Sequence, residues 1–274
     1  MPAISTNTAA NSAVRYLNIN SSQESSALAK LSSGSRITQA SDDAAGLAIS
    51  TRISSDVTTL QQAATNASQA TSILQTADGG ASNISDILAR MKSLASESSS
   101  GTVTDSSRAY INSEFSQLTN EIDSIATGTR YGGQSLLDGT SAFASGVSVL
   151  VGSSASDTIT ITLSSLTASA LGVGSLNVST QSGATSALTT LDTAINSVSA
   201  ARASIGAQES RFGFSSNSIS TQTQNLQSAN SAITDVDIAA EQATLSSAEV
   251  KTQAAVSAET AANQMPQYLL KLLG

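Results

Sequence analysis

With 274 residues, 20 acidic and 12 basic side chains and a net charge of −8, the chain is too acidic for a nucleic-acid partner, which would require clustered Lys and Arg. The absence of His and Cys removes the usual general base, metal ligand and thiol nucleophile, so we expect no catalytic residue, no metal site and no cofactor. No run of 18 apolar residues is present, so no membrane span is expected.

The N-terminal segment, about residues 3–34, is rich in Ala, Ser and Asn and is predicted to be a helix that stops at Gly34. A link over 35–40 follows. The sequence Ser41-Asp42-Asp43 is typical of a helix start, because carboxylates stabilise the positive end of the helix dipole. We interpret the two aspartates as a cap and not as a catalytic pair, because adjacent residues do not share a helix face.

The next segment carries apolar residues at helical spacing, which predicts a coiled-coil-type helix that stops at Gly79-Gly80. A shorter helix should then end in the loop 98–104, and another should end at Gly128. Tyr131-Gly132-Gly133 predicts a turn or bulge. The apolar stripe of the first helix consists of Ile49, Ile53, Val57, Leu60, Ala64, Ala67 and Leu74.

The middle of the chain changes period. Val147, Val149 and Val151 alternate with polar residues, and the alternation returns over 159–163. Period two with β-branched residues predicts a hairpin. Helix should resume at about Ala184, and a last Ala-rich helical segment should cover about 238–273.

The clearest pattern is an apolar residue at every seventh position near the C-terminus. A repeat of seven places these side chains on one seam of a helix, which requires a partner helix. One continuous helix over 191–233 would be roughly 64 Å long at about 1.5 Å per residue, which suits a fibre better than a compact domain. The repeat consists of Leu191, Val198, Ile205, Phe212, Ile219, Leu226 and Ile233.

The predicted fold class is therefore mainly α. The N- and C-terminal regions should form a long antiparallel coiled-coil-like helical bundle, with a small β-hairpin region in the middle. Long helices of matching composition from opposite ends of the chain should pair with each other.

Four stretches of the chain resemble bacterial flagellin. Leu31-Ser-Ser-Gly-Ser-Arg-Ile37, followed by Ala40-Ser-Asp-Asp-Ala-Ala-Gly-Leu-Ala-Ile49, is similar to the N-terminal signature of that family. The stretch 129–139, with Tyr131-Gly132 in place of Phe-Asn, resembles its "FNG…LLDG" element. Residues 261–266 and 269–273 resemble its C-terminal end. The resemblance covers nearly the whole chain except roughly 140–185, where larger flagellins insert variable outer domains.

The resemblance implies a structural subunit that polymerises into the helical flagellar filament used for swimming motility. It also implies three regions. Residues 1–43 and 236–274 would form a terminal helical inner-layer domain, 44–137 and 186–235 would form the helical bundle of the outer layer, and 138–185 would be a small β-rich segment of that layer. The alternative is a hook-filament junction or cap-like protein with similar terminal helices. An enzyme is the least favoured reading, because 140–185 holds only one carboxylate.

Three sets of residues follow from these patterns. Bundle or subunit packing is expected of Ile49, Ile53, Val57, Leu60, Leu191, Val198, Ile205, Phe212, Ile219, Leu226 and Ile233. Inner-layer packing is expected of Val14, Leu17, Leu28, Leu31, Leu245, Val256, Leu269, Leu270 and Leu273. The family resemblance implies contact with innate immune receptors at Arg90, Leu94 and Glu114, and an ordinary subunit contact is the alternative for these three.

The expected partner is the chain itself, as a helical homopolymer. The resemblance adds the flagellar export apparatus, an export chaperone, and hook-associated junction and cap proteins, and it implies an extracellular location in the filament. Residues 1–42 hold too few large apolar side chains to offset the backbone entropy of ordering them. We therefore expect the arms 1–42 and 236–274 to be largely disordered in the free monomer and helical only in the filament.

Overall fold

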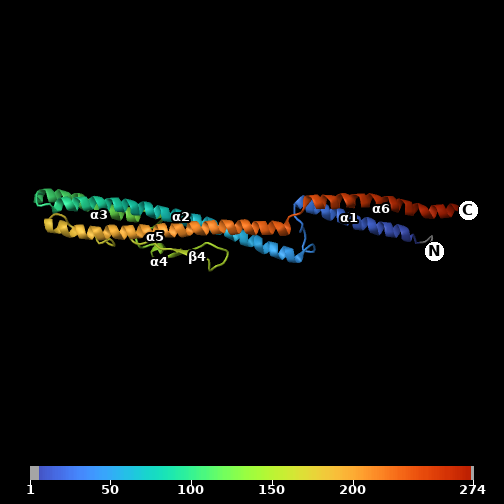
Figure 1. Cartoon of the computed structure of the whole chain (residues 1–274), viewed down its shortest axis with the longest axis horizontal. Helices are drawn as coiled ribbons and strands as arrows, with labels where there is room; N and C mark the ends of the chain where they lie inside the picture. The colour runs from blue at the N-terminus through green and yellow to red at the C-terminus, as the bar shows by residue number, and fades with distance from the viewer. Residues whose placement is uncertain (1–5, 273–274) are drawn as a thin grey trace. The chain divides into compact units, whose positions relative to one another are not determined.

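The computed structural model describes residues 6–272, and it confirms the predicted class: long helices with small antiparallel hairpins between them (Figure 1). The helices are α1 (Thr8–Ser33), α2 (Ala44–Ser99), α3 (Asp105–Gly128), α4 (Ala142–Ser145), α5 (Gln181–Thr234) and α6 (Ile238–Leu272). The strands are β1 (Arg130–Tyr131), β2 (Gln134–Ser135), β3 (Val147–Leu150) and β4 (Thr158–Ile161). Contacts divide the chain into unit 1, residues 1–55 and 225–274, and unit 2, residues 56–224.

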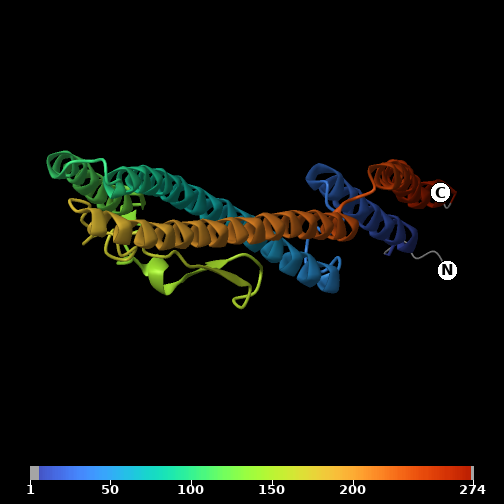
Figure 2. The same cartoon turned by 60° about the vertical axis from the view of Figure 1, so that its left-hand side comes forward.

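In unit 2, α2, α3 and α5 run side by side, as both views show (Figures 1 and 2). The buried positions of α2 and α5 alternate in steps of three and four residues, the spacing of a coiled-coil seam. On α2 they include Leu60, Ala63, Ala67, Ala70, Leu74, Ala77, Ala81, Ile84, Leu88 and Met91. On α5 they are Ala184, Ala187, Leu191, Ala194, Val198, Ala201, Ile205, Gln208, Phe212 and Ile219. Large and small side chains thus share one continuous seam.

The predicted stop at Gly79-Gly80 is wrong, because α2 continues through both glycines to Ser99. Gly80 lets a neighbouring segment approach the α2 backbone closely. A Cβ at Gly80 would lie 2.4 Å from Thr129 Oγ1 and 2.9 Å from Leu137 Cδ1, whereas a Cβ at Gly79 would meet nothing within 4 Å. The end of α3 and the segment that follows it therefore pack directly on the α2 backbone.

The reversal between α2 and α3 is held by a buried arginine. Arg108 is 7% exposed, and its Nε donates to Ser98 O at 2.9 Å. Its two terminal nitrogens donate to Ser100 O and to Asp105 Oδ1. Carbonyl groups at the end of a helix lack intrahelical donors, so the guanidinium satisfies the C-terminal turn of α2 and fixes the loop.

The β elements are two hairpins. Strands β1 and β2 pair through Tyr131 and Gln134 across Gly132-Gly133, whose φ angles of 58° and 84° give the two-residue turn that glycine favours. The predicted hairpin over 147–161 is confirmed as β3 paired with β4, with Val147 opposite Ile161. Gln208 of α5 binds the backbone next to the end of β4. Its side chain accepts from Thr162 N and donates to Thr162 O, each at 3.0 Å.

The segment between β4 and α5 packs on the bundle without regular secondary structure. Leu166, Val173 and Val178 are buried within the core of unit 2. Side chains of α3 hold its backbone: Asp123 Oδ1 accepts from Ala168 N at 2.8 Å, and Asn112 Oδ1 accepts from Val178 N at 2.9 Å. Side chains thus take the place of a strand partner for this stretch.

Candidate assembly surfaces and helix joint

A hydrogen-bonded joint in unit 1 ties the link after α1 to the end of α5. Gly34, at φ 70°, ends α1 in the left-handed conformation, as its sequence position predicts. Its carbonyl accepts from Val236 N at 3.1 Å, and Arg36 N donates to Thr234 O at 2.6 Å. The Arg36 side chain donates to Ile233 O through Nε at 3.2 Å and through Nη2 at 2.8 Å. A cation therefore caps the negative end of α5.

The same joint includes both aspartates of the N-terminal signature. Asp43 Oδ1 accepts from Gly46 N at 2.8 Å and so caps α2, as predicted. Asp42 Oδ2 accepts from Thr38 N, Thr38 Oγ1 and Gln39 N, which closes the turn before the helix. The hydrogen bonds from the Thr38 backbone and side chain hold the pKa of Asp42 below its ordinary value. The residues of the N-terminal signature thus hold the link between α1 and α2 and the start of α2.

The residues expected to pack the bundle differ in how deeply they lie. Leu191, Val198, Ile205, Phe212 and Ile219 are buried, and so is Leu60. Ile53, Val57, Leu226 and Ile233 are half-buried. Ile49 is 52% exposed in the single chain, which is open to subunit packing but not to packing within the bundle. The early part of α2 and the last part of α5 belong to unit 1, where little apolar surface is covered.

Ion pairs between α2 and α5 were not visible in the sequence. Arg202 of α5 donates to both carboxylate oxygens of Asp78, at 2.8 and 3.2 Å, and Lys92 pairs with Asp192. The hydrogen bonds and charge of Asp78 raise the pKa of Arg202. The positions on α5 rise as those on α2 fall, so the two helices are antiparallel. The one signal in the sequence is that these charged residues flank the apolar positions of the α2–α5 seam.

The terminal helices α1 and α6 pair in antiparallel fashion, as predicted. Asn7 Nδ2 donates to Ala262 O at 2.8 Å, and Thr252 Oγ1 donates to Glu24 Oε2 at 3.2 Å. Among the side chains that the structure describes, the buried residues of the pair are mostly alanine. They are Ala27, Leu245, Ala248, Ala255 and Ala262. Because this part of the seam is built mostly from small side chains, it buries little large apolar surface.

Three of the six inner-layer packing residues whose side chains the structure describes are exposed in the single chain. Leu28 is 58% exposed, Val256 46% and Val14 38%, whereas Leu17 and Leu31 are half-buried and Leu245 is buried. Leu273 and the side chains of Leu269 and Leu270 lie outside the described residues. Further large apolar side chains on the pair are also exposed. They are Tyr16, Ile19, Ile238, Val250, Met265 and Tyr268.

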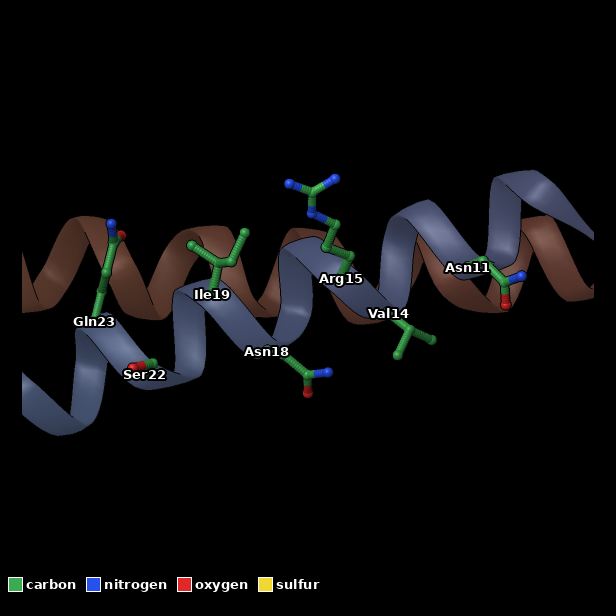
Figure 3. Close-up of a pocket in the computed structure, with 7 residues that line it drawn as sticks. All are labelled: Asn11, Val14, Arg15, Asn18, Ile19, Ser22 and Gln23. Atoms are coloured by element: carbon green, nitrogen blue, oxygen red, sulfur yellow. The ribbon is translucent and has the colours of Figure 1, made fainter.

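The face of α1 that lies away from α6 holds a groove of about 660 Å³, which we call the α1 groove. It is lined by Asn11, Val14, Arg15, Asn18, Ile19, Ser22 and Gln23, all from α1 (Figure 3). Val14 and Ile19 supply its apolar surface. Arg15 is the one charged residue among the seven that line the groove. A mixed face of this kind, open to solvent in the single chain, suits a protein partner.

The three residues implied as immune-receptor contacts do not all share a surface. Arg90 donates to Glu114 Oε1 through Nε at 3.0 Å and through Nη2 at 2.7 Å, and both side chains are exposed. Leu94 is only 2% exposed and packs in the core of unit 2. In the single chain, Leu94 therefore cannot be a surface contact, because the neighbouring helices cover its side chain.

Over residues 6–272, no group of three acidic side chains is gathered in a way that could hold a metal ion. None of the described helices combines the length and apolarity needed to cross a membrane.

Comparison with known proteins gives a consistent result. A family model described as the bacterial flagellin N-terminal helical region matches residues 4–142, and one described as the bacterial flagellin C-terminal helical region matches residues 188–273. Together they span the two helical parts of the chain. The unmatched stretch between them contains the β3–β4 hairpin.

Curated relatives match over nearly their whole length. The flagellin of Halalkalibacterium halodurans is 36% identical over 272 residues, which cover 98% of this chain and 99% of that protein. The flagellin of Listeria monocytogenes is 35% identical over 271 residues and 94% of each chain. The flagellar filament 30.7 kDa core protein of Treponema maltophilum is 34% identical over 94% of this chain and 95% of its own.

Two solved structures share the architecture. The crystal structure of Bacillus cereus flagellin superposes with a TM-score of 0.52 at 32% identity, covering 61% of this chain and 94% of that chain. A putative flagellar hook-associated protein from Vibrio parahaemolyticus gives a TM-score of 0.59 at 15% identity, covering 71% and 100%. At that identity the second likeness concerns the fold alone.

Proposed function

The chain belongs to the bacterial flagellin family, and we propose that its two units have different tasks in the flagellar filament. As a flagellin it is a structural protein that polymerises into the helical filament used for swimming motility, outside the cell body. A junction or cap-like role is not favoured, because the curated proteins that match nearly the whole chain are named as flagellins or filament proteins.

The proposed division of tasks places residues 1–43 and 236–274 in the inner layer of the filament. The observation that carries it is the unusual exposure of the α1–α6 pair. Its own seam is mostly alanine, whereas Leu28, Val250 and Met265 are between 58% and 70% exposed. Large apolar side chains left open in this number are stabilised only when neighbouring copies cover them.

Residues 44–137 and 186–235 would then form the helical bundle of the outer layer. Support comes from the seam of unit 2, which buries its large apolar residues within one chain. Because the bundle satisfies its own core, its outer faces are left for polar contacts between subunits. The segment 138–185, with the β3–β4 hairpin, would lie toward the outside of the filament.

Epitope tags in the full chain test this radial order. We expect a tag inserted at Ser153-Ser154, the exposed tip of the hairpin, to be tolerated and reached by antibody on intact filaments. A tag inserted at Ala9 should be masked in filaments and accessible in monomers. A masked hairpin tag together with an accessible tag at Ala9 would reverse the proposed order.

We extend the proposal to the partners that act before and after polymerisation. These are the flagellar export apparatus and an export chaperone, and then the hook-associated junction and cap proteins. Support comes from family membership and from the weak seam of the α1–α6 pair, which suits a chain exported unfolded. Retention of the protein inside cells that lack the export apparatus would test the first of these partners.

The exposed Arg90–Glu114 pair stays a proposed receptor or subunit contact. Because both side chains are exposed, the pair adds at most about 1 kcal/mol to the stability of the fold. A change at Glu114 should therefore affect recognition without unfolding the subunit.

A further inference from the structure

The α1–α6 pair has two unlike outer faces. One is the α1 groove, and the other is a face of α6 that we call the α6 ridge, formed by Glu249, Val250, Gln253, Val256 and Ser257. These positions recur at helical spacing on the exposed surface of α6 that flanks the buried line of Leu245, Ala248 and Ala255. All five ridge residues are exposed, Val250 to 70%.

The two faces carry opposite charge beside exposed apolar side chains. Arg15 lies in the α1 groove between Val14 and Ile19, and in the part of the chain that the structure describes it has no ion-pair partner. Glu249 is likewise without an ion-pair partner there, and it lies beside Val250. The other acidic residues of α6, Glu241 and Glu259, are half-buried, so Glu249 is the exposed acid of this helix.

We propose that the α1 groove of one subunit receives the α6 ridge of a neighbouring copy, with Arg15 donating hydrogen bonds to the neighbour's Glu249. The proposal rests on the inner-layer role proposed above and specifies which faces meet. Valine side chains of the ridge cover Val14 and Ile19, and the ion pair sets the register of the two helices. A guanidinium shielded from water by the surrounding contact forms a stronger pair than one on a free surface.

The contact is heterologous, because groove and ridge are different surfaces of the same subunit. Each subunit can offer its groove to one neighbour and its ridge to another. A head-to-tail contact of this kind generates an open helical filament when the rotation between copies does not close a ring. The face pairing is therefore compatible with the helical polymer that this family builds.

Charge exchange in the full-length protein tests the pairing. Arg15→Glu places like charges in the contact, and so does Glu249→Arg. We expect each variant alone to raise the critical concentration for polymerisation on filament seeds by roughly tenfold or more. An equimolar mixture of the two should polymerise, because alternating subunits restore an opposite pair at every contact. The chain that carries both changes should polymerise alone.

The matched control is Lys251→Glu, which alters the net charge of the α1–α6 pair by the same amount as Arg15→Glu but lies off the ridge. Alone it should polymerise like the wild-type chain, because it leaves both Arg15 and Glu249 in place. Circular dichroism of each monomer shows whether the fold is intact, which is expected because Arg15 and Glu249 are exposed.

Two results overturn the inference: wild-type polymerisation of both single variants, or failure of both the mixture and the double variant when each single variant is defective. Neither touches the inner-layer role, which is tested separately by the masking of a tag at Ala9. An accessible tag at Ala9 in filaments would instead remove the proposed function on which the inference rests.

Discussion

Gly80 lies in the interior of α2, where glycine ordinarily weakens a helix by about 1 kcal/mol relative to alanine. The structure gives the compensating reason, because Thr129 and Leu137 occupy the space of a side chain. Thr129 cannot move away freely, since its Oγ1 donates to Ile125 O at 2.7 Å. One absent methyl group thus lets the segment after α3 approach the α2 backbone.

We expect Gly80→Ala to lower the free energy of unfolding by about 1–3 kcal/mol, because overpacking outweighs the gain in helix propensity. Gly79→Ala is the matched control. It should raise the free energy by about 0.5–1 kcal/mol, since nothing lies within 4 Å of its Cβ. Urea unfolding followed by circular dichroism measures both. Equal stability of the two variants would contradict the close-approach explanation.

Glu209 of α5 carries a carboxylate whose Oε1 is buried and has no hydrogen-bond donor. Burial raises the pKa of Glu209, and the nearby charge of Asp78 raises it further. A carboxyl with a raised folded-state pKa binds a proton more readily in the native chain than in the unfolded chain. Ionisation of Glu209 therefore lowers stability as the pH rises above its ordinary pKa of 4.5.

We expect Glu209→Gln to raise the free energy of unfolding by up to about 1 kcal/mol near pH 7, because the amide carries no charge to be desolvated. The gain should disappear at about pH 4, where the carboxyl is protonated in both native and unfolded chains. Urea midpoints at the two pH values decide the matter. A gain that is independent of pH would mean that the charge is not the cause.

At the scale of elements, the α2–α5 seam shows that a repeat of large residues reveals only part of the buried positions of a coiled coil. The sequence revealed one position of each heptad of α5, from Leu191 to Ile219. The other position is filled by Ala187, Ala194, Ala201 and Gln208, which are also buried. Alanine is so common in this chain that its period is hidden. Gln208 is polar, and its buried amide is hydrogen-bonded to the backbone of Thr162, which follows β4.

We expect Ile219→Asp to lower the free energy of unfolding by several kcal/mol, because it places an unpaired charge in the seam. Ser220→Asp is the control, since Ser220 is the exposed neighbour on the same helix. Helix content and filament yield should fall for the first variant only. Normal yield and unchanged helicity of Ile219→Asp would argue against the packing of this seam.

At the scale of the whole molecule, the two units differ in how they obtain stability. Unit 2 contains the continuous hydrophobic core, with aromatic and aliphatic side chains that are almost fully covered. Unit 1 depends on an alanine-rich seam and on the hydrogen-bonded joint around Arg36. Small side chains bury little area, so the terminal helices gain little from pairing within one chain.

We therefore expect limited proteolysis of the monomer to remove about residues 1–42 and 236–274 first and to leave a resistant fragment near 43–235. Filaments should protect the same ends, because neighbouring copies cover the exposed apolar faces of α1 and α6. Mass spectrometry of timed digests identifies the cut sites. A trimmed fragment that still builds normal filaments would show that the arms do not hold the polymer together.

The sequence by itself determined those features whose physics is local. The seven-residue repeat, the stop at Gly34, the cap at Asp43 and the alternation over 147–161 each follow from spacing or from backbone chemistry, and all are present in the fold. Composition likewise showed that residues 1–42 hold few large apolar side chains. The expectation that the arms are disordered in the free monomer stays a prediction.

Other features depend on which element packs against a residue, and these only the tertiary structure decided. It converted Gly80 from a predicted stop into a point of close packing, buried Leu94 between helices, and left Ile49 exposed although it belongs to an apolar stripe. It also brought Asp78 to Arg202, which lie far apart in the sequence. Periodicity fixes which face of a helix a residue occupies, but whether that face is covered depends on the partner element, which a pattern along one chain does not contain.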